Sequence, residues 1–330
     1  MVSVGPSIAE VDQRAVNDDL IICTRHRPHE LRRCLDSVVA QTRVPTTTLV
    51  VDSSEDDTSK RVVDDFASRW PADRVLVYVH SEPATVHQRV VGLRESAAPI
   101  VHYVDDDTVL EPGYIEGIVT TFEEDAAEAL GGVGGFVTDQ PEHRYRRIDE
   151  WLGLDSRHEG VVLPSGRNIR IYTEPARDID VDWISGCAMS YRRSALEREP
   201  PDERVGRNRN GEDVQLSYRV RQHARLVVTP RARLAHITSD VERRGIAQLT
   251  TVELVSRWER VRAGTGNLSR RAFWVSAFGQ CALYGTKAAF TLRMPAAPNP
   301  CMMRATVNKS SVCDSEQNSD ASVNSTRPAR

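Results

Sequence analysis

Lysine is nearly absent from this sequence, and the charge balance excludes one large class of partner. Only Lys60, Lys287 and Lys309 are lysine, so the basic side is almost entirely arginine. Basic and acidic residues number 43 and 47, for a formal net charge of −4. Because nucleic-acid binders usually carry a basic excess, this balance predicts a protein with no nucleic-acid partner.

Paired cysteines and long apolar runs are missing as well. The six cysteines include no C-x-x-C pair, which excludes a zinc framework and a small disulfide scaffold. Residues 1–19 lack a basic region followed by an apolar run, so we predict no signal peptide. The run 272–290 is interrupted by polar residues and by Lys287, and a core or surface helix is therefore favoured over a membrane span. These absences predict a cytoplasmic protein.

Glycine is missing where nucleotide-binding loops need it. No G-x-x-x-x-G-K-[ST] occurs, and no glycine lies between Leu20 and Arg27, so a P-loop and the usual dinucleotide fingerprint are excluded. No G-x-S-x-G elbow occurs either. A nucleotide diphosphate would therefore have to be held by a metal and by arginines, for which Arg25, Arg27 and Arg89 are available.

What the sequence does contain is a regular alternation of strand and helix patterns over residues 20–104. Apolar runs predict strands at 20–23, 49–51, 75–79 and 100–104, and apolar residues at helical spacing predict helices at 31–39, 62–70 and 86–97. Such alternation predicts an α/β fold with a mainly parallel sheet covered by helices on both faces. Ligands bind such sheets beyond the carboxyl ends of the strands.

The second half of the sequence is less regular. We expect a helix at 115–122, a glycine-rich strand at 131–137, a helix from 211 to about 223, one or two strands at 226–237 interrupted by Pro230, and helices at 241–262 and 268–290. Residues 139–180 are polar and rich in arginine, and we interpret them as a long excursion. The tail 294–330 has the composition of a disordered segment.

Three consecutive carboxylates follow the fourth predicted strand. Side chains alternate along a strand, so Asp105 and Asp107 are expected to point one way and Asp106 the other. Their mutual repulsion needs an opposing charge, and a divalent cation, Mg²⁺ or Mn²⁺, is the simple candidate. The alternative is a solvated acidic turn that caps the next helix.

A second acidic motif, Gly211-Glu212-Asp213, lies about a hundred residues downstream. Two carboxylates at a helix start are often only a favourable first turn. Together with the aspartate triplet they allow a division of roles, in which one group holds metal and phosphate while the other acts as a general base.

These motifs, in this order, resemble those of the family 2 glycosyltransferases, which have the GT-A fold. The resemblance covers roughly residues 18–240, and it rests on the segments 21–28, 34–42, 50–58, 89–92, 103–112, 183–189 and 211–213. It implies a Rossmann-like, mainly parallel sheet sandwiched by helices. Within 18–240 it implies a nucleotide-binding half (18–110) and an acceptor half (111–240), flanked by an extension at 1–17 and a C-terminal helical segment at 241–293.

The resemblance also implies roles for particular residues. Those expected to bind the nucleotide sugar are Cys23, Thr24, Arg25, Asp52, Ser53, Arg89, Asp105 and Asp106. Asp107, Asp105 and His236 are expected to bind the divalent cation, Asp213 to act as the catalytic base, and Trp183, Gly186 and Glu212 to contact the acceptor. The implied reaction is metal-dependent and inverting, and it moves a sugar from a nucleotide diphosphate to a hydroxyl in glycan or glycolipid synthesis.

Several choices stay open at the level of sequence. Arg25, His26, Ser53 and Val90 depart from the family's motifs, so the donor could be a UDP-, dTDP- or GDP-sugar and the acceptor a sugar or a lipid-linked sugar. The alternatives are a nucleotidyltransferase of the same fold and a non-catalytic nucleotide-binding member. Residues 257–290 combine aromatics with arginines, which is consistent with peripheral contact at the inner face of a membrane or with helices packed on the catalytic domain.

Overall fold

The structure is a computed structural model that describes residues 16–140, 142–203, 211–237 and 246–293. Nearly all of the predicted extension 1–17 and the whole tail 294–330 lie outside these residues. The chain divides into one compact unit that ends at Ala282 and another from Leu283 to Arg330. The sheet, the site and most of the C-terminal helices belong to the first unit.

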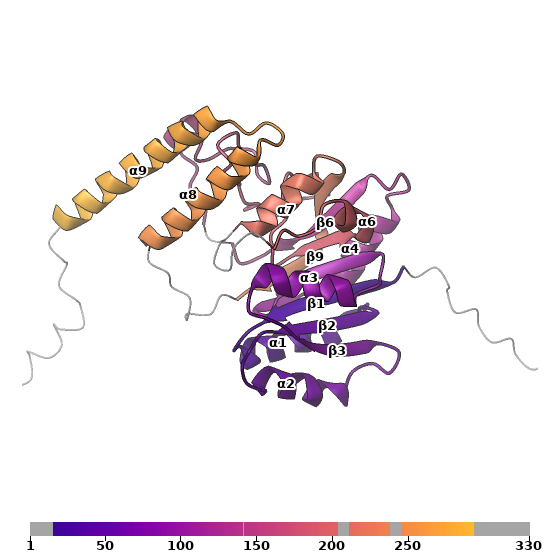
Figure 1. Cartoon of the computed structure of the whole chain (residues 1–330). Coiled ribbons are helices and arrows are strands. Elements are labelled where there is room, and N and C mark those ends of the chain that lie inside the picture. Colours follow the sequence, from indigo (N-terminus) through magenta and orange to yellow (C-terminus); the bar gives the residue numbers. More distant parts are fainter. Residues whose placement is uncertain (1–15, 141, 204–210, 238–245, 294–330) are drawn as a thin grey trace, which may run out of the picture. The chain divides into compact units, whose positions relative to one another are not determined.

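A mixed sheet forms the centre of this unit (Figure 1). Its described strands are β1 (Asp18–Thr24), β2 (Thr47–Asp52), β3 (Val75–His80), β4 (Ile100–Asp105), β5 (Thr108–Leu110), β6 (Leu130–Val137), β7 (Ile179–Asp180), β8 (Met189–Arg192) and β9 (Arg225–His236). They run in the order β3-β2-β1-β4-β8-β6-β9-β5, with β7 also on β9. The first four strands are parallel, whereas β8 joins β4 and β6 antiparallel.

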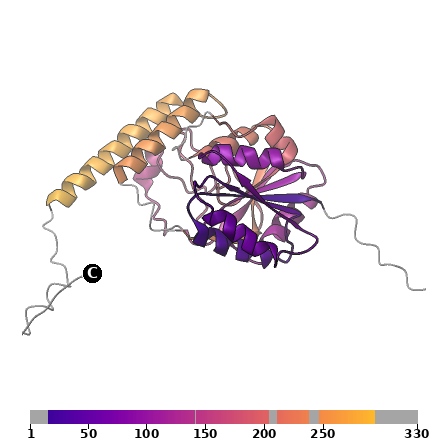
Figure 2. The same ribbon diagram turned by 60° about the horizontal axis from the view of Figure 1, so that its bottom comes forward.

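Helices cover both faces of this sheet, as the alternating pattern predicts (Figures 1 and 2). The described helices are α1 (Pro28–Val39), α2 (Thr58–Ala67), α3 (Thr85–Glu95), α4 (Tyr114–Glu123), α5 (Arg147–Trp151), α6 (Arg193–Arg198), α7 (Glu212–Val220), α8 (Ile246–Ala263) and α9 (Arg270–Arg293). Leu20 and Ile22 pack with α1, α2 and α4, and Ile21 packs on the other face with α3, α6 and α7. The alternation of side chains along β1 thus supplies two cores.

The structure adds detail to three sequence expectations. Residues 225–236 form one strand, and its pairing with β6 shifts register next to Pro230, because proline cannot donate to the ladder and is tolerated at such an irregularity. The excursion 139–180 contains α5 and β7. Of the helix expected at 241–262, residues 241–245 lie outside the described residues, and α8 is described from Ile246 to Ala263. Within the part of the chain that the structure describes, no helix has the length and hydropathy needed to cross a membrane.

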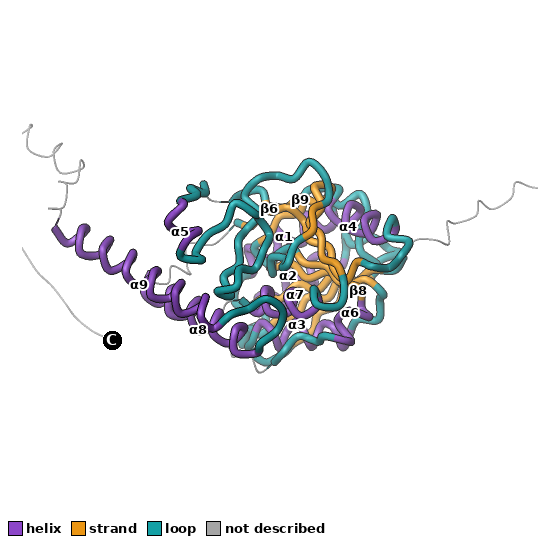
Figure 3. Tube along the Cα trace, turned by 90° about the horizontal axis from the view of Figure 1, so that it is seen from above, coloured by secondary structure: helices purple, strands orange, loops and turns teal. Residues whose placement is uncertain are grey.

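The part of α9 up to Ala282 lies beside α8 (Figure 3), and a buried arginine joins the two helices. Arg257 on α8 is fully buried and donates to the Gln280 side chain at 2.8 Å and to Ser276, both on α9. It also reaches the Ser165 carbonyl at 3.4 Å. Burial lowers the pKa of Arg257 to about 10. The C-terminal helices are therefore fastened to the loop around Ser165, which borders the site.

Candidate active site

A cavity of about 840 Å³ lies at the carboxyl ends of β1, β2 and β4. Parallel pairing aligns these strand ends, because Cys23 of β1 pairs with Val51 of β2 and with Asp105 of β4. Side chains from the strand ends, from the starts of α3 and α7, and from α8 line the cavity. The sheet thus brings the two acidic motifs of the sequence to one space.

The aspartate triplet lies at the tight turn between β4 and β5, and its members have different partners. Asp105 pairs with Arg89 at 3.3 Å. Asp106 accepts a hydrogen bond from the Thr24 hydroxyl at 2.7 Å and pairs with Arg27 at 3.2 Å. Asp107 also pairs with Arg27 at 3.2 Å. The arginines Arg27 and Arg89 offset the repulsion within the triplet.

His236 completes a group of three side chains that could hold a metal ion. The antiparallel pairing of β5 with β9 sets Thr108 opposite His236, which brings the imidazole Nε2 to 3.0 Å from Asp107 Oδ1. Ligand atoms of Asp105, Asp107 and His236 all lie within 4.8 Å of one another. Asp105 and Asp107 therefore share a side of the turn, as strand alternation predicts, while Asp106 stands apart from the group.

This group suits a divalent cation. The buried Asp107 Oδ1 has the His236 imidazole beside it as an ion-pair partner, and no described donor meets it in hydrogen-bond geometry. Two carboxylates and one imidazole form a donor set that Mg²⁺ or Mn²⁺ accepts, with water or phosphate oxygens completing the shell.

Burial and charge set the protonation of the triplet. Burial raises the pKa of Asp106 to about 7, although Thr24 and Arg27 oppose it. Burial also raises the pKa of Asp105 against the effect of Arg89. At Asp107 burial acts in the same direction, but His236 and Arg27 outweigh it and hold the pKa below its usual value. Asp107 is thus the member of the triplet whose carboxyl group loses its proton most readily.

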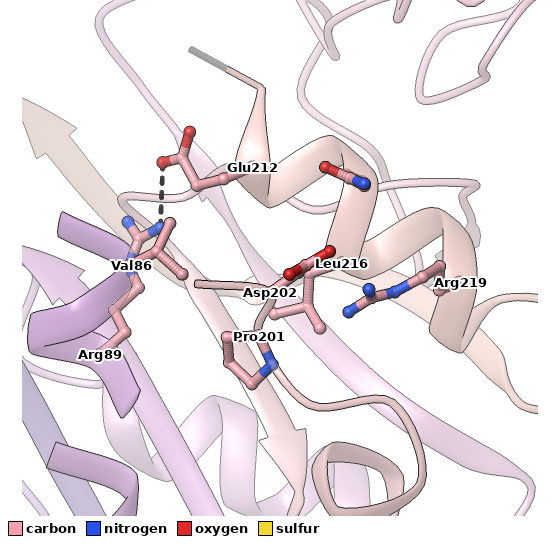
Figure 4. Close-up of a pocket in the computed structure, with 8 residues that line it drawn as sticks. Val86, Arg89, Pro201, Asp202, Glu212, Leu216 and Arg219 are labelled. Carbon is pink, nitrogen blue, oxygen red and sulfur yellow. Dashed lines mark hydrogen bonds and ion pairs between the residues drawn. The ribbon is translucent and has the colours of Figure 1, made fainter. Parts of the chain in front are cut away.

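Arg89 connects the triplet to α7, and Figure 4 shows its ion pair with Glu212. Its guanidinium, only 4% exposed, pairs with Glu212 at 3.1 Å and donates to the Gly186 carbonyl at 3.3 Å. Burial, with the charge of Asp213 next to it, raises the pKa of Glu212. A small pocket between α3 and α7 borders this ion pair and is also lined by Val86 and Leu216. Arg89 thus links the metal-binding edge to the predicted acceptor side.

Asp213 faces the same cavity from the first turn of α7. Its Oδ2 accepts a hydrogen bond from the Gly186 amide at 3.0 Å. The helix is preceded by Gly211, whose φ of 99° lies in the left-handed region that favours glycine. Arg260 of α8 donates to the Gly211 carbonyl at 3.0 Å. These contacts fix the position of the Asp213 carboxylate.

The remaining predicted residues divide into cavity-lining and buried positions. The cavity-lining members are Cys23, Thr24, Arg25, Ser53, Trp183 and Gly186. Asp52 does not line it, because this fully buried carboxylate accepts hydrogen bonds from Ser54 and from the Tyr78 hydroxyl at 3.0 Å. Trp183 donates its indole N–H to the Ile169 carbonyl at 2.9 Å. Burial raises the pKa of Cys23 to about 12, so its thiol stays protonated.

Some cavity residues are not evident from sequence motifs. Gln88 on α3 donates to the carbonyls of Thr24 and Val51 at 2.9 and 2.8 Å and thereby joins the ends of β1 and β2. The excursion and α8 also contribute, through Gln140, Arg167, Asn168, Arg170, Ile171, Tyr172, Glu253, Ser256 and Arg260. The arginine-rich composition of 139–180 is the one sequence signal that points to this wall.

The family model for glycosyl transferase family 2 matches residues 19–199. The chain belongs to this family. It is 29% identical over 155 residues to the glucosyl-dolichyl phosphate glucuronosyltransferase of Haloferax volcanii, a match that covers 45% of this chain and 49% of the relative. The chain thus spans about half the length of this curated relative. The family expected from the motifs of the sequence is confirmed.

Solved glycosyltransferases share the fold at low sequence identity. A mannosyltransferase from Pyrobaculum calidifontis, solved with GDP-Man and Mn²⁺, superimposes with a TM-score of 0.54 at 16% identity, over 87% of this chain and 78% of that one. GalNAc-T7, solved with UDP, GalNAc and Mn²⁺, gives a TM-score of 0.55 at 11% identity, over 86% and 59% of the two chains. These likenesses confirm the GT-A fold of this family 2 glycosyltransferase.

The family match ends before several residues of the cavity. Its limit at residue 199 leaves Asp213, His236 and α8 outside the matched segment. The structure nevertheless brings all three to the wall of the same cavity as Asp105 and Asp107. In this glycosyltransferase the site is therefore completed by elements that the family match does not include.

Proposed function

We propose that this glycosyltransferase transfers a sugar from a nucleotide-diphosphate donor to an acceptor hydroxyl with a divalent cation and with inversion, in glycan or glycolipid synthesis. One observation carries the proposal. The metal-binding group Asp105, Asp107 and His236 and the carboxylate of Asp213 line one cavity of about 840 Å³. This arrangement supports a site that holds a diphosphate at one end and a proton acceptor at the other.

The donor end is formed by the carboxyl edge of the sheet. Asp105, Asp107 and His236 would hold Mg²⁺ or Mn²⁺, which when bound neutralises the charge that develops on the leaving diphosphate. Arg27 adds positive charge beside Asp106 and Asp107. Cys23, Thr24, Arg25 and Ser53 line the part of the cavity nearest β1 and β2, and they would contact the nucleoside.

The acceptor end is formed around Asp213. Its carboxylate takes the proton of the acceptor hydroxyl as the oxygen forms a bond to the anomeric carbon. The bond from that carbon to the diphosphate breaks on the opposite face, and the nucleotide diphosphate leaves with the electron pair. The Gly186 amide orients Asp213, and holding both substrates in one geometry supplies much of the rate.

The donor nucleoside and the acceptor belong to this proposal. The similar structures solved with UDP or GDP-Man support UDP-, dTDP- and GDP-sugars as candidates. The Haloferax relative, by its name, acts on a glucosyl-dolichyl phosphate, which supports a sugar or lipid-linked sugar as acceptor here. A nucleotidyltransferase activity is disfavoured, because residues 20–35 contain no glycine to form a triphosphate loop.

The test is thermal stabilisation by UDP, dTDP and GDP, each with and without Mn²⁺. A ligand that binds only the folded state raises the melting temperature by mass action. We expect one nucleotide to stabilise the protein only with Mn²⁺, and the Asp107→Ala variant to lose this shift. The control Asp180→Ala removes an exposed aspartate outside the cavity. No shift with any nucleotide would contradict the proposed donor site.

Contact with a membrane surface is part of the proposal and rests on α9. The helix buries Phe273, Ser276, Ala277 and Gln280 against its neighbours and exposes Arg270, Arg271, Trp274, Val275 and Phe278 on its other side. Residues 260–293 contain no aspartate or glutamate. An aromatic and cationic helix face of this kind suits an anionic lipid interface, such as the inner face of a membrane.

Vesicle binding tests this contact. The protein is sedimented with vesicles of phosphatidylcholine alone or mixed with phosphatidylglycerol. We expect binding to the anionic vesicles, and loss of binding in a Trp274→Ser, Phe278→Ser double variant. Equal sedimentation of the wild type and the double variant would refute the role of this face.

A further inference from the structure

Three arginines line the cavity besides Arg25, Arg27 and Arg89. Arg167 and Arg170 come from the excursion, and Arg260 comes from α8. Glu212, Asp213 and Glu253 line the same cavity, where Glu212 is paired with Arg89 and Glu253 with Arg167. The cavity therefore carries arginines beyond those that pair with the two acidic motifs.

Arg167 forms an ion pair with Glu253. Arg170 and Arg260 form no ion pair with a carboxylate among the described residues. Arg260, which is 5% exposed, donates to the carbonyls of Gly211 and Gly166 at 3.0 and 3.1 Å, and its buried Nε has no acceptor. Burial lowers the pKa of Arg260 to about 10, so it is charged at neutral pH. Its hydrogen bonds go to neutral carbonyls, while the charges of Asp213, Glu253 and Glu212 act on it from nearby, and a further anion would offset the cost of its burial more closely.

Arg170 is exposed on the described surface and makes no hydrogen bond or ion pair with any described residue. It lies in a segment that contributes Arg167, Asn168, Arg170, Ile171 and Tyr172 to the lining of the cavity. The segment is fixed at Ile169 by Trp183, and the Tyr172 ring stacks on His143 at 4.1 Å. Arg170 is thus presented to the cavity from an anchored segment.

We propose that Arg167, Arg170 and Arg260 form a subsite for a phosphate group carried by the acceptor. The proposal rests on the proposed function and names the acceptor class of that same site. A guanidinium matches phosphate oxygens with paired N–H donors. The Arg170 donors have no acceptor among the described residues, and Arg167 and Arg260 would add positive charge to the same cavity. Because Arg260 also holds the Gly211 carbonyl, two residues before Asp213, a phosphate seated here would place a neighbouring hydroxyl toward the base.

The experiment measures acceptor binding with the donor site already filled. The full chain is saturated with Mn²⁺ and the nucleoside diphosphate that stabilises it, so that a phosphate probe cannot occupy the donor position. Glucose 1-phosphate and methyl glucoside are then titrated by calorimetry. We expect glucose 1-phosphate to bind at least about tenfold more tightly than methyl glucoside, because one hydrogen bond between charged groups provides about this gain in affinity.

Substitutions test whether phosphate binding needs these particular arginines or only positive charge on the protein. Arg170→Gln changes an exposed residue and is expected to weaken glucose 1-phosphate about tenfold while leaving methyl glucoside unchanged. Arg260→Lys keeps the charge but loses the planar fork, and we expect a smaller loss. The control Arg225→Gln removes an exposed arginine paired with Asp180 outside the cavity and should leave both affinities as in the wild type.

The outcomes distinguish this inference from the proposed function. Equal binding of the two probes, or an Arg170→Gln variant that binds glucose 1-phosphate as the wild type does, overturns the phosphate subsite while nucleotide stabilisation still stands. Absence of any nucleotide stabilisation overturns the proposed function itself. Dodecyl glucosyl phosphate tests whether the phosphate of the acceptor is linked to a lipid. Tighter binding than glucose 1-phosphate supports a lipid-linked phosphate, and equal binding supports a free sugar phosphate.

Discussion

Removal of the Arg89 guanidinium tests how the acidic groups of the site are held together. Arg89 is 4% exposed and pairs with Asp105 at 3.3 Å and Glu212 at 3.1 Å. The variant Arg89→Met keeps the side-chain length but leaves both carboxylates without this partner. Breaking a buried ion pair from one side costs about 3–5 kcal/mol, because the remaining charge stays desolvated.

The size of this loss can be measured by thermal unfolding at pH 7 in EDTA, which removes any metal contribution. In domains of this size about 1 kcal/mol corresponds to about 2 °C, so Arg89→Met should melt about 6–10 °C below the wild type. The matched control is Arg225→Met, whose pair with Asp180 is more than half exposed on both sides and should contribute less than about 1 kcal/mol. Equal melting temperatures for the two variants would refute the reasoning.

Three further predictions concern catalysis, pH and packing. Asp213→Asn should lower the turnover number about 10²- to 10⁴-fold and leave the Mn²⁺-dependent stabilisation by nucleotide unchanged; a collapse of nucleotide binding would contradict its role as base. Burial opposes ionisation of Asp18, but His102 and a nearby arginine outweigh it and lower its pKa below 3.8. Its contribution to stability is therefore present above that value and is lost as the pH falls through the lowered pKa. The gap in urea midpoint between wild type and Asp18→Asn should thus be widest near neutral pH and should shrink below about pH 4; a constant gap would argue against it. Gly117→Ala should cost about 1–3 kcal/mol in urea unfolding, because an added Cβ would lie 2.6 Å from a backbone oxygen, whereas at Gly113 nothing lies within 4 Å.

The local pattern of the first hundred residues was sufficient to predict their elements. The run at Leu20–Cys23 is buried on both faces, because parallel strands under crossover helices have no solvent side. The helix at 28–39 begins with Pro28 and buries Leu31, Cys34, Leu35 and Val38, as its spacing predicts. Short elements such as β5 and α6 were missed, because a few residues carry no periodicity.

The candidate site was predictable in its residue types but not in its geometry. The sequence pointed to the aspartate triplet and to Asp213, since consecutive carboxylates after a buried strand need an opposing charge. The sequence does not show that the Asp52 carboxylate already accepts hydrogen bonds from Ser54 and Tyr78. Nor could it show that the buried Arg89 spans from Asp105 to Glu212, because contacts between residues 123 positions apart depend on packing.

The sequence by itself determined the α/β class, the sheet edge at which the cavity lies and the family, because these follow from local periodicity and from motifs in order. Only the tertiary structure decided which side chains share the cavity. Antiparallel pairing of β5 with β9 brings His236 to Asp107, and the packing of α8 brings Arg260 to Gly211. Both depend on long-range pairing, which no window of sequence contains.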